Sequence, residues 1–217
     1  NMKTEYIITS LIGLFLLAIC KPAVHLIKTK WNENIEILDD IPPGFTNDAS
    51  RLNLTKIDSL VYLSSDYEQS IKQIQSLLNL AFRQNKPISI AGGKYSMGGH
   101  SIYPNGIVID MNSFKTIQID TFSNVAKIGA GARWSEVIDE LDKYNRSVKV
   151  MQAFSSFSIG GSISVNGHGW QKNTAPVSSS VISMLVMKAD GQIVKCSLSE
   201  NQELFRLVIG GYGLFGI

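Results

Sequence analysis

The sequence predicts an α+β fold that is preceded by an N-terminal apolar helix. Short stretches with strand-like alternation are separated by amphipathic helical stretches in an irregular order. Two pairs of strand candidates, at 114–130 and 181–196, have the spacing of hairpins. A parallel doubly wound sheet would instead require strands and helices in regular alternation. The helix is predicted by a stretch without charges, Tyr6 to Cys20.

Composition limits the classes of function. A chain of 217 residues with 44% hydrophobic content can bury a core, as one large domain or as two small lobes. Its 20 basic and 18 acidic residues contain no Lys/Arg cluster that would neutralise a phosphate backbone, so we expect no nucleic-acid partner. The two cysteines, Cys20 and Cys196, are far apart and suggest neither a disulfide framework nor a metal site.

Residues 1–30 are predicted to be a membrane anchor or a signal-like helix. The uncharged stretch would be about 22 Å long as a helix, against about 30 Å of hydrocarbon, and residues 23–27 can extend it. No A-x-A-like cleavage site follows it. An uncleaved anchor is preferred, while a removed signal peptide and an interfacial or buried helix remain open. Lysines are more numerous after the stretch than before it, which favours a membrane-anchored protein with a cytoplasmic body.

Residues 31–58 form a lead-in segment without periodicity, and the regular pattern starts at residue 59. Residues 59–63 are a strand candidate, and Ser65 with Glu68 predicts a capping box that opens a helix ending before Pro87. The apolar face of that helix consists of Ile71, Ile74, Leu77, Leu78 and Ala81.

The remaining pattern predicts further strands and two more helices. Strands are expected at 88–91, 107–110, 114–120, 124–130, 147–151, 181–188 and 192–196. One helix carries a buried stripe of Trp134, Val137, Ile138, Leu141 and Tyr144. The other starts at a second capping box, Ser199 with Gln202, and contains Leu204, Phe205 and Val208.

Three glycine-rich segments, at 91–100, 158–169 and 210–216, are the strongest functional signal. The first, Ala91 to His100, joins two strands and has four glycines. It lacks the Walker A pattern, which requires a serine or threonine after the lysine and a glycine five residues before the second glycine. Here Tyr95 follows Gly93-Lys94, and residue 88 is isoleucine. A dinucleotide fingerprint also fails, since Trp134 stands where the third glycine after Gly129-Ala130-Gly131 belongs. Backbone amides of a loop can still wrap a pyrophosphate without a helix, although a ligand-free hairpin loop remains the alternative.

Several motifs in order resemble one known family. They are P-I-S-I-A-G-G-K-Y-S-M-G-G-H, G-I-V-I-D-M, G-A-G-A-R-W, S-I-G-G-S-I-S-V-N-G-H-G, A-D-G-Q-I-V-K-C-S and E-L-F-R-L-V-I-G-G-Y-G-L-F-G-I. Their order is similar to the FAD-binding half of the vanillyl-alcohol-oxidase superfamily, the FAD-linked oxidases with a PCMH-type domain. Cytokinin dehydrogenases, sugar-lactone oxidases and the decaprenylphosphoryl-ribose oxidase are members. The resemblance covers residues 45–217.

The resemblance implies a two-lobed FAD-binding domain at 59–217, with lobes at 59–110 and 111–217 and FAD between them. The first flavin loop would consist of Gly92, Gly93, Lys94, Tyr95, Ser96 and His100. The second would consist of Ser158, Gly160, Gly161, Ser164, Gly167 and His168, near the pyrophosphate and the flavin ring. Ile217 would offer its backbone to the cofactor.

Tyr95 departs from the family pattern, and the roles of two histidines are left open. Many members attach FAD through a histidine before the loop serine, and that position is Tyr95 here, so we predict non-covalent FAD. His100 is interpreted as a hydrogen-bonding residue, with alternative attachment left open. His168 is interpreted as a hydrogen-bond donor beside the flavin, with substrate orientation left open.

The resemblance implies an FAD-dependent oxidoreductase. It would oxidise an alcohol, a sugar or a polyprenyl-linked sugar by hydride transfer to flavin N5, with oxygen or another electron acceptor. Members continue into a substrate-binding cap domain, so we expect that domain in a longer protein or in a partner chain, together with the catalytic residues. An NAD(P)H-dependent flavin reductase and a non-catalytic flavin-binding module are the alternatives.

Overall fold

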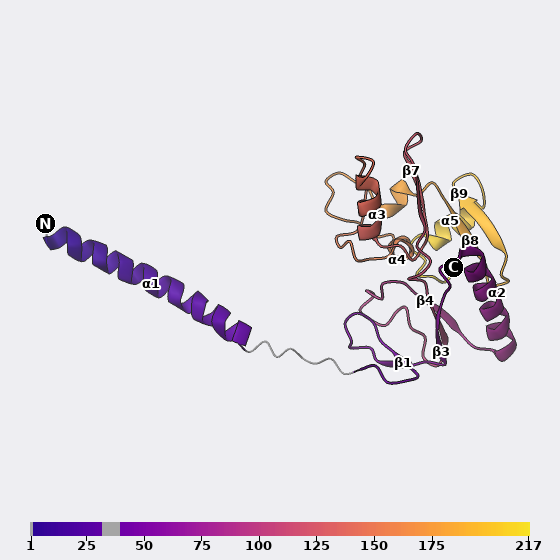
Figure 1. Ribbon diagram of the computed structural model, residues 1–217, viewed down its shortest axis with the longest axis horizontal. Coiled ribbons are helices and arrows are strands. Elements are labelled where there is room, and N and C mark those ends of the chain that lie inside the picture. Colours follow the sequence, from indigo (N-terminus) through magenta and orange to yellow (C-terminus); the bar gives the residue numbers. More distant parts are fainter. Residues whose placement is uncertain (1, 32–39) are drawn as a thin grey trace. The chain divides into compact units, whose positions relative to one another are not determined.

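The structure is a computed structural model that describes residues 2–31 and 40–217. It separates into two compact units, Asn1–Asp40 and Ile41–Ile217 (Figure 1). In the first unit, α1 covers Met2–Trp31. Among the residues that the structure describes, no helix combines the length and the apolar character needed for a membrane crossing. Membrane anchoring therefore stays a prediction, and lead-in residues 32–39 lie outside the described part of the chain.

The second unit contains a three-stranded parallel sheet. Its strands are β3 (Ser59–Tyr62), β5 (Ile107–Asp110) and β4 (Ile88–Ala91), with β5 in the middle. All four residues of β5 are buried, as expected for the central strand of a covered sheet. Helix α2 (Tyr67–Gln84) connects β3 to β4 and supplies the crossover that a parallel pair requires.

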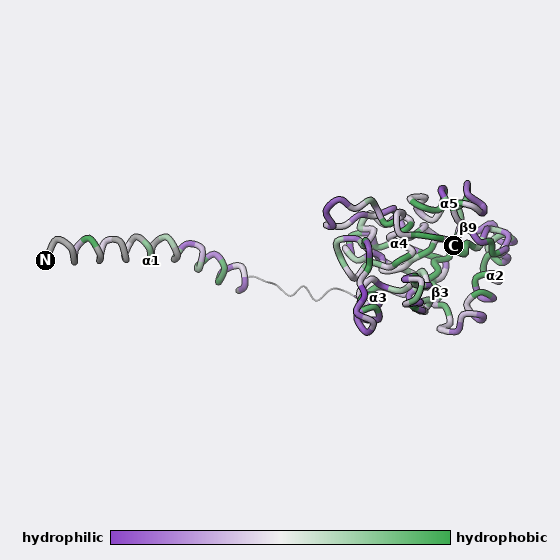
Figure 2. The backbone as a smooth tube through the Cα atoms, turned by 90° about the horizontal axis from the view of Figure 1, so that it is seen from above, coloured by the Kyte–Doolittle hydropathy of each residue, from purple (hydrophilic) through white to green (hydrophobic). Residues whose placement is uncertain are grey.

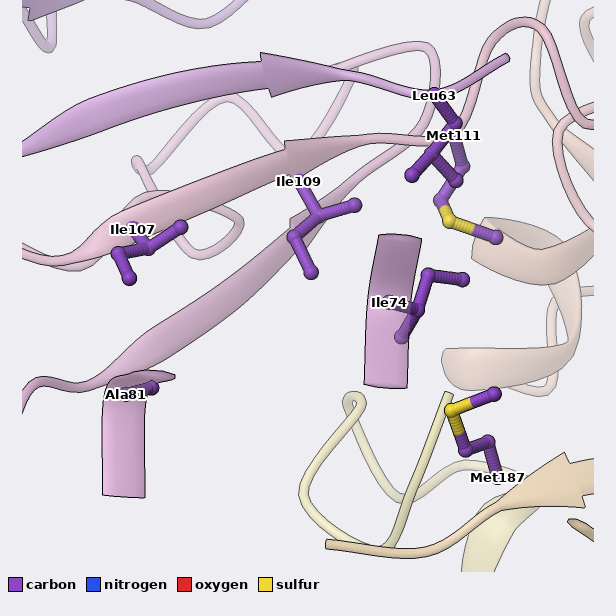
Figure 3. Packing of buried hydrophobic residues seen from close by; sticks show 7 residues of the cluster. All are labelled: Leu63, Ile74, Ala81, Ile107, Ile109, Met111 and Met187. Carbon is purple, nitrogen blue, oxygen red and sulfur yellow. The ribbon is translucent and has the colours of Figure 1, made fainter. Parts of the chain in front are cut away.

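Helix α2 packs its predicted apolar face on this sheet. Ile74 and Ala81 lie toward Ile107 and Ile109 of β5 (Figure 3). The helix ends at a left-handed Asn85 shortly before Pro87, as predicted. Its N-cap is Asp66, whose carboxylate accepts a hydrogen bond from Gln69 N at 2.8 Å. The predicted Ser65 capping box is therefore wrong, because the carboxylate one residue later takes the capping role.

Three antiparallel pairs complete the sheet structure. They are β1 (Phe45–Thr46) with β2 (Thr55–Lys56), β6 (Ile117–Asp120) with β7 (Val125–Ile128), and β8 (Ser183–Met187) with β9 (Ile193–Ser197). Hydrophobic stretches of the second unit run through its interior, and hydrophilic stretches lie at outer turns (Figure 2). The predicted α+β mixture of helices and hairpins is confirmed, the three-stranded parallel sheet was not predicted, and the division into lobes at residue 110 stays a prediction.

The remaining helices are α3 (Trp134–Asp142), α4 (Ile159–Ser164), η1 (Val177–Ser180) and α5 (Gln202–Val208). The strand predicted at 147–151 is wrong, although Val150 is buried. The second capping box is also wrong, because Asn201 precedes α5 and makes no side-chain cap. Ile138 is exposed, and Tyr144 is exposed and lies beyond the end of α3, so the predicted buried stripe is reduced to Trp134, Val137 and Leu141.

Candidate cofactor-binding site

The first glycine loop, defined as residues 92–100, leaves the carboxyl end of β4 beside the carboxyl end of β5. Ligands of parallel sheets are commonly bound beyond the carboxyl ends of the strands. The loop therefore lies where the topology favours a binding site.

The loop presents a row of backbone N–H groups. From Gly92 to Met97, none of these groups has a hydrogen-bond acceptor among residues 2–31 and 40–217. The row ends at Gly98 and Gly99, whose N–H groups both donate to the carbonyl oxygen of Ser96. Consecutive unpaired amides in a loop form an anion-binding concavity. A diphosphate is an anion of the size that such a row of donors suits.

Lys94 lies inside this loop with a left-handed backbone, at φ 59°. Its Nζ atom lies 3.5 Å from Oδ2 of Asp110, the last residue of β5, and the Asp110 side chain is only 5% exposed. The ammonium group thus compensates a buried carboxylate of the sheet. Its contribution to the site includes anchoring the loop to β5, in addition to the positive charge that it brings near the amides.

A network of hydrogen bonds connects the start of the first glycine loop to residues of the predicted second lobe, 111–217. Asn112 Nδ2 donates to the carbonyl of Gly92 at 3.2 Å, and Arg133 donates to Asn112 Oδ1 at 3.5 Å. Arg133 also donates to the carbonyl of Ser156 at 3.3 Å. Asn112 and Arg133 were assigned no role from the sequence, although Arg133 lies in the motif G-A-G-A-R-W. A polar residue two positions after a buried strand was the available signal for Asn112.

Tyr95 packs against aromatic residues rather than standing alone. Its ring centroid lies 5.1 Å from that of Phe157, which in turn lies 5.6 Å from the ring of Phe154. The Tyr95 side chain is partly exposed, and its hydroxyl makes no hydrogen bond within the described residues. The ring therefore links the first loop to the residues before Ser158.

The hydroxyl and imidazole groups of the first loop are placed differently. The Ser96 hydroxyl has no hydrogen-bond partner among the described residues, and it remains available to a ligand. His100 is exposed, and its ring lies over Gly98, where an added Cβ would collide with it. Ser101, which the sequence did not single out, has a buried hydroxyl without a partner in the described part of the chain.

A buried carboxylate outside the glycine segments also reaches the loop. Asp48, 4% exposed, accepts a hydrogen bond from Gly99 N at 3.0 Å. Desolvation favours a raised pKa for Asp48, but hydrogen bonds from Ser50, Gly99 and Asn53 outweigh it and lower the pKa below 3.8. The residue is therefore charged at neutral pH. The sequence marked its surroundings only as a lead-in without periodicity.

The second glycine segment, defined as residues 158–169, is largely helical. Ser158 caps α4 by accepting a hydrogen bond from Gly161 N at 3.4 Å. Ile159 N and Gly160 N donate to backbone carbonyls of the segment 130–132, at 2.8 Å each. Further along, Val165, Asn166 and Gly167 also donate to backbone carbonyls. Most of its amides are thus used by the fold, in contrast to those of the first loop.

The two glycine segments meet at Gly92. An added Cβ at Gly92 would collide with the Ser158 hydroxyl, so only glycine allows this approach. Gly160 similarly lies against Ala130, 3.0 Å from an added Cβ to the Ala130 carbonyl oxygen. The structure therefore brings Ser158 and Gly160 beside the beginning of the first loop.

Beneath α4 lies a buried hydrogen-bonding centre. Trp134 Nε1 donates to Ser162 Oγ at 2.8 Å, and Ser162 Oγ lies 2.6 Å from Gln152 Oε1. Ser162 is fully buried, and Gly167 packs on the Gln152 side chain. Ser164 lies at the end of α4 and accepts Tyr212 N at its carbonyl. His168 is exposed, with Nδ1 3.4 Å from the carbonyl of Gly169.

Ile217 pairs with β8 and packs in the main core. Its N–H donates to the Met187 carbonyl at 3.0 Å, and Met187 N donates back at 2.8 Å. Its backbone is consequently occupied by β8, and its side chain lies against the cluster of α2 and β5. One surface hollow, of about 370 Å³, lies beside the β6–β7 hairpin, and another, of about 380 Å³, lies between η1, α5 and Asn166 of the second glycine segment.

Residues 67–197 match the sequence model of a family described as an FAD binding domain. An uncharacterized oxidoreductase of the fasciation locus of Rhodococcoides fascians is 30% identical over 150 residues, which is 69% of this chain and 34% of that protein. L-gulonolactone oxidase of Mus musculus is 26% identical over 149 residues, 68% of this chain and 34% of the oxidase. Cytokinin dehydrogenase 1 of Arabidopsis thaliana is 27% identical over 148 residues, 66% and 26% of the two chains.

The chain therefore spans about a third of the length of these relatives or less. The first glycine loop and the second glycine segment both fall inside the matched range. The residues fit FAD on chemical grounds, because the unpaired amides of Gly92 to Met97 suit its diphosphate. Gly92 also approaches Ser158 closely because it has no Cβ atom, and this contact brings together the two segments that the resemblance assigns to the cofactor.

Proposed function

Because the chain belongs to the FAD binding domain family that its residues 67–197 match, we propose that it is the FAD-binding portion of a flavoprotein oxidoreductase. FAD is the cofactor of this domain. The observation that carries the proposal is the row of unpaired amides from Gly92 to Met97 at the end of β4. When bound, FAD supplies an acceptor for the hydride of a substrate C–H bond.

The first glycine loop holds the diphosphate. The unpaired amides from Gly92 to Met97 would donate to phosphate oxygens, and the Ser96 hydroxyl would add a donor. Lys94 fixes the loop through Asp110 and brings positive charge close to the anion. His100 contributes a side-chain hydrogen bond at the far end of the loop.

The second glycine segment forms the other side of the site. Ser158, Gly160 and Gly161 lie at the start of α4, next to Gly92, where they limit the space beside the loop. Ser164, Gly167 and His168 complete the set that we assign to the cofactor, whereas the Ile217 backbone predicted to contact FAD is paired with Met187 of β8. Among them, the exposed imidazole of His168 is the group that is free to turn toward a flavin ring.

The flavin is held without a covalent bond. Tyr95 occupies the place before the loop serine, and its ring is packed on Phe157. Precipitation of the FAD-loaded protein with acid is expected to leave all yellow colour in the supernatant. Flavin that remains with the washed precipitate would contradict this part of the proposal.

The substrate is an alcohol, a sugar or a polyprenyl-linked sugar, and oxygen or another acceptor reoxidises the flavin. Support comes from the relatives, which are named as a gulonolactone oxidase and a cytokinin dehydrogenase. We expect the catalytic residues in a region that corresponds to the unmatched two thirds of these relatives, either in a longer protein or in a partner chain. Anaerobic bleaching of bound flavin by a panel of alditols, lactones and isoprenoid sugars tests the class.

The N-terminal helix anchors the protein to a membrane, with the body on the cytoplasmic side. The support is the sequence alone: the uncharged stretch from Tyr6 to Cys20, followed by Lys21, Lys28 and Lys30. Extraction of cell membranes with carbonate tests this assignment. The full chain should stay in the membrane pellet, and a chain starting at Ile41 should be released.

The binding proposal is tested by titrating purified protein with FAD and following the quenching of flavin fluorescence. Saturable binding of one FAD per chain is expected, because one first glycine loop is present. A protein that neither contains flavin nor binds added FAD would overturn the proposed function.

A further inference from the structure

A short segment that precedes the FAD-binding motifs in the sequence is hydrogen-bonded to the first glycine loop. We call this segment, Thr46 to Asn53, the clasp. Three of its residues are buried, namely Thr46, Asn47 and Asp48, with 2%, 7% and 4% exposure. The clasp lies outside the range of residues 67–197 that matches the family. Its burial indicates that it is part of the folded body rather than a loose lead-in.

Three hydrogen bonds join the clasp to the loop. Gly99 N donates to Asp48 Oδ2 at 3.0 Å, and Ala49 N donates to the carbonyl of Lys94 at 2.9 Å. Asn53 Nδ2 also lies 3.4 Å from the carbonyl oxygen of Met97. The contacts are spread over the loop, so the clasp fixes its middle and its end together.

The Asp48 carboxylate is itself rigidly held. Oδ1 accepts hydrogen bonds from Ser50 N at 3.0 Å and Ser50 Oγ at 2.5 Å, while Oδ2 accepts one from Asn53 Nδ2 at 2.7 Å. Asn47 Oδ1 accepts Asp48 N and Asn53 N, both at 3.0 Å. A buried carboxylate is stable only when its oxygens are paired in this way. Donation from Gly99 N completes the set.

The direction of these bonds determines where the loop amides point. In a trans peptide the carbonyl oxygen and the next N–H lie on opposite sides of the chain. Because Ala49 fixes the Lys94 carbonyl toward the clasp, the N–H of Tyr95 must point away from the clasp. That N–H belongs to the row of unpaired amides from Gly92 to Met97.

We propose that Asp48 is a positioning residue for FAD, and that the clasp pre-shapes the first glycine loop so that its amides face the diphosphate. The inference rests on the proposed binding of FAD by that loop. Without the clasp, the loop would have to be ordered when FAD binds, and this entropic cost would weaken the affinity. Asp48 acts through Gly99 and does not contact the cofactor.

The test compares the FAD affinity of the full chain with that of Asp48→Asn. The amide keeps one acceptor, but its NH₂ group faces Gly99 N or the Ser50 donors, so at least one bond of the clasp is lost. The dissociation constant from fluorescence quenching should rise about tenfold. Asn53→Ala removes the contact to Met97 and one hydrogen bond to Asp48 Oδ2 but keeps the carboxylate and its bond from Gly99 N. It should give a smaller rise, and it serves if Asp48→Asn does not fold.

Two control variants separate positioning from general stability. Asp120 is also a turn carboxylate, accepting Phe122 N at 2.9 Å and Ser123 Oγ at 2.6 Å in the β6–β7 turn, so Asp120→Asn removes the same chemistry elsewhere. Asp66→Ala removes the cap of α2 and lowers the melting temperature. Both controls should bind FAD as the wild type does.

The outcomes are distinguishable. Wild-type FAD affinity in Asp48→Asn and Asn53→Ala would overturn the proposed role of the clasp, and so would tighter binding through loss of a repulsive charge. Either result would leave the proposed function intact. Equal weakening in the Asp66→Ala control would also overturn it, because the effect would then follow stability. Failure of the wild type to bind FAD would overturn the proposed function and the clasp together.

Discussion

The first glycine loop and the second glycine segment both combine glycine with hydroxyl side chains, yet the fold uses their backbones differently. From Gly92 to Met97 the amides lack acceptors within the described residues. The loop is instead held by hydrogen bonds from other segments to its carbonyl oxygens and by the bond from Gly99 N to Asp48. From Ile159 to Ser162 and again at 165–167, the amides donate to the chain itself. Glycine content alone therefore does not identify an anion site. An anion-binding loop differs from a packed segment in that its backbone amides are not already hydrogen-bonded within the fold.

Replacing Lys94 tests the first loop most severely. Lys94→Met leaves the buried Asp110 carboxylate without its cation, which should reduce the free energy of unfolding by about 3 kcal/mol. Urea denaturation of the FAD-free protein measures the loss. Lys94→Met combined with Asp110→Asn removes both charges and should recover much of it. A single variant as stable as the wild type would show that the pair does not anchor the loop.

Removing the Ser162 hydroxyl tests the second segment. Ser162→Ala leaves the buried Trp134 N–H without its acceptor, and the unfolding free energy should fall by about 2 kcal/mol. FAD affinity of the folded protein should stay unchanged, because the hydroxyl faces the interior beneath α4. A large loss of affinity with little loss of stability would reverse the contrast between the two segments.

Lowering the pH should weaken the clasp before it weakens the packing around α4, because the clasp depends on the Asp48 carboxylate. The folded-state pKa of Asp48 is lowered below 3.8, because hydrogen bonds outweigh the desolvation that alone would raise it. Its stabilisation is thus present above the unfolded pKa and is lost as the pH falls through the folded value. Thermal melts of wild type and Asp48→Asn should differ by a constant amount at pH 6 to 8 and converge at acid pH. A difference that grows toward acid pH would contradict the assignment.

The smallest effect is expected at Tyr95. Tyr95→Phe keeps the ring contact with Phe157 and removes a hydroxyl that has no partner in the described part of the chain. Stability should change by less than about 0.5 kcal/mol, and FAD affinity should stay the same. Tyr95→Ala, which removes the aromatic contact, is the matched comparison and should be less stable by about 1 kcal/mol. Loss of FAD binding in Tyr95→Phe would mean that the hydroxyl contacts the cofactor.

The periodic parts of the fold could be predicted from the sequence. The apolar face of α2 follows from its spacing, because the helix buries one side, and the strands around Ile88 and Ile107 follow from short apolar runs. The strand predicted at 147–151 failed because a short apolar run is also buried as irregular chain, as Val150 shows. The capping residue of α2 was misplaced because Ser65 and Asp66 are both good caps.

The candidate site was predictable where it depends on glycine and not where it depends on long-range polar contacts. The resemblance assigned the two glycine segments, and the structure brings Gly92 against Ser158. Asp48, Asn112 and Arg133 were missed, because their partners lie far away in the sequence. For Asp48 the partner Gly99 is 51 positions distant, and no local pattern encodes that contact.

Amide hydrogen exchange with and without FAD tests the central claim most directly. The account predicts that FAD slows exchange at Gly93 to Met97, whose amides gain acceptors, and changes it little at Ile159 to Ser162, whose amides already have them. FAD that binds tightly while exchange at Gly93 to Met97 stays as fast as in the free protein would contradict it.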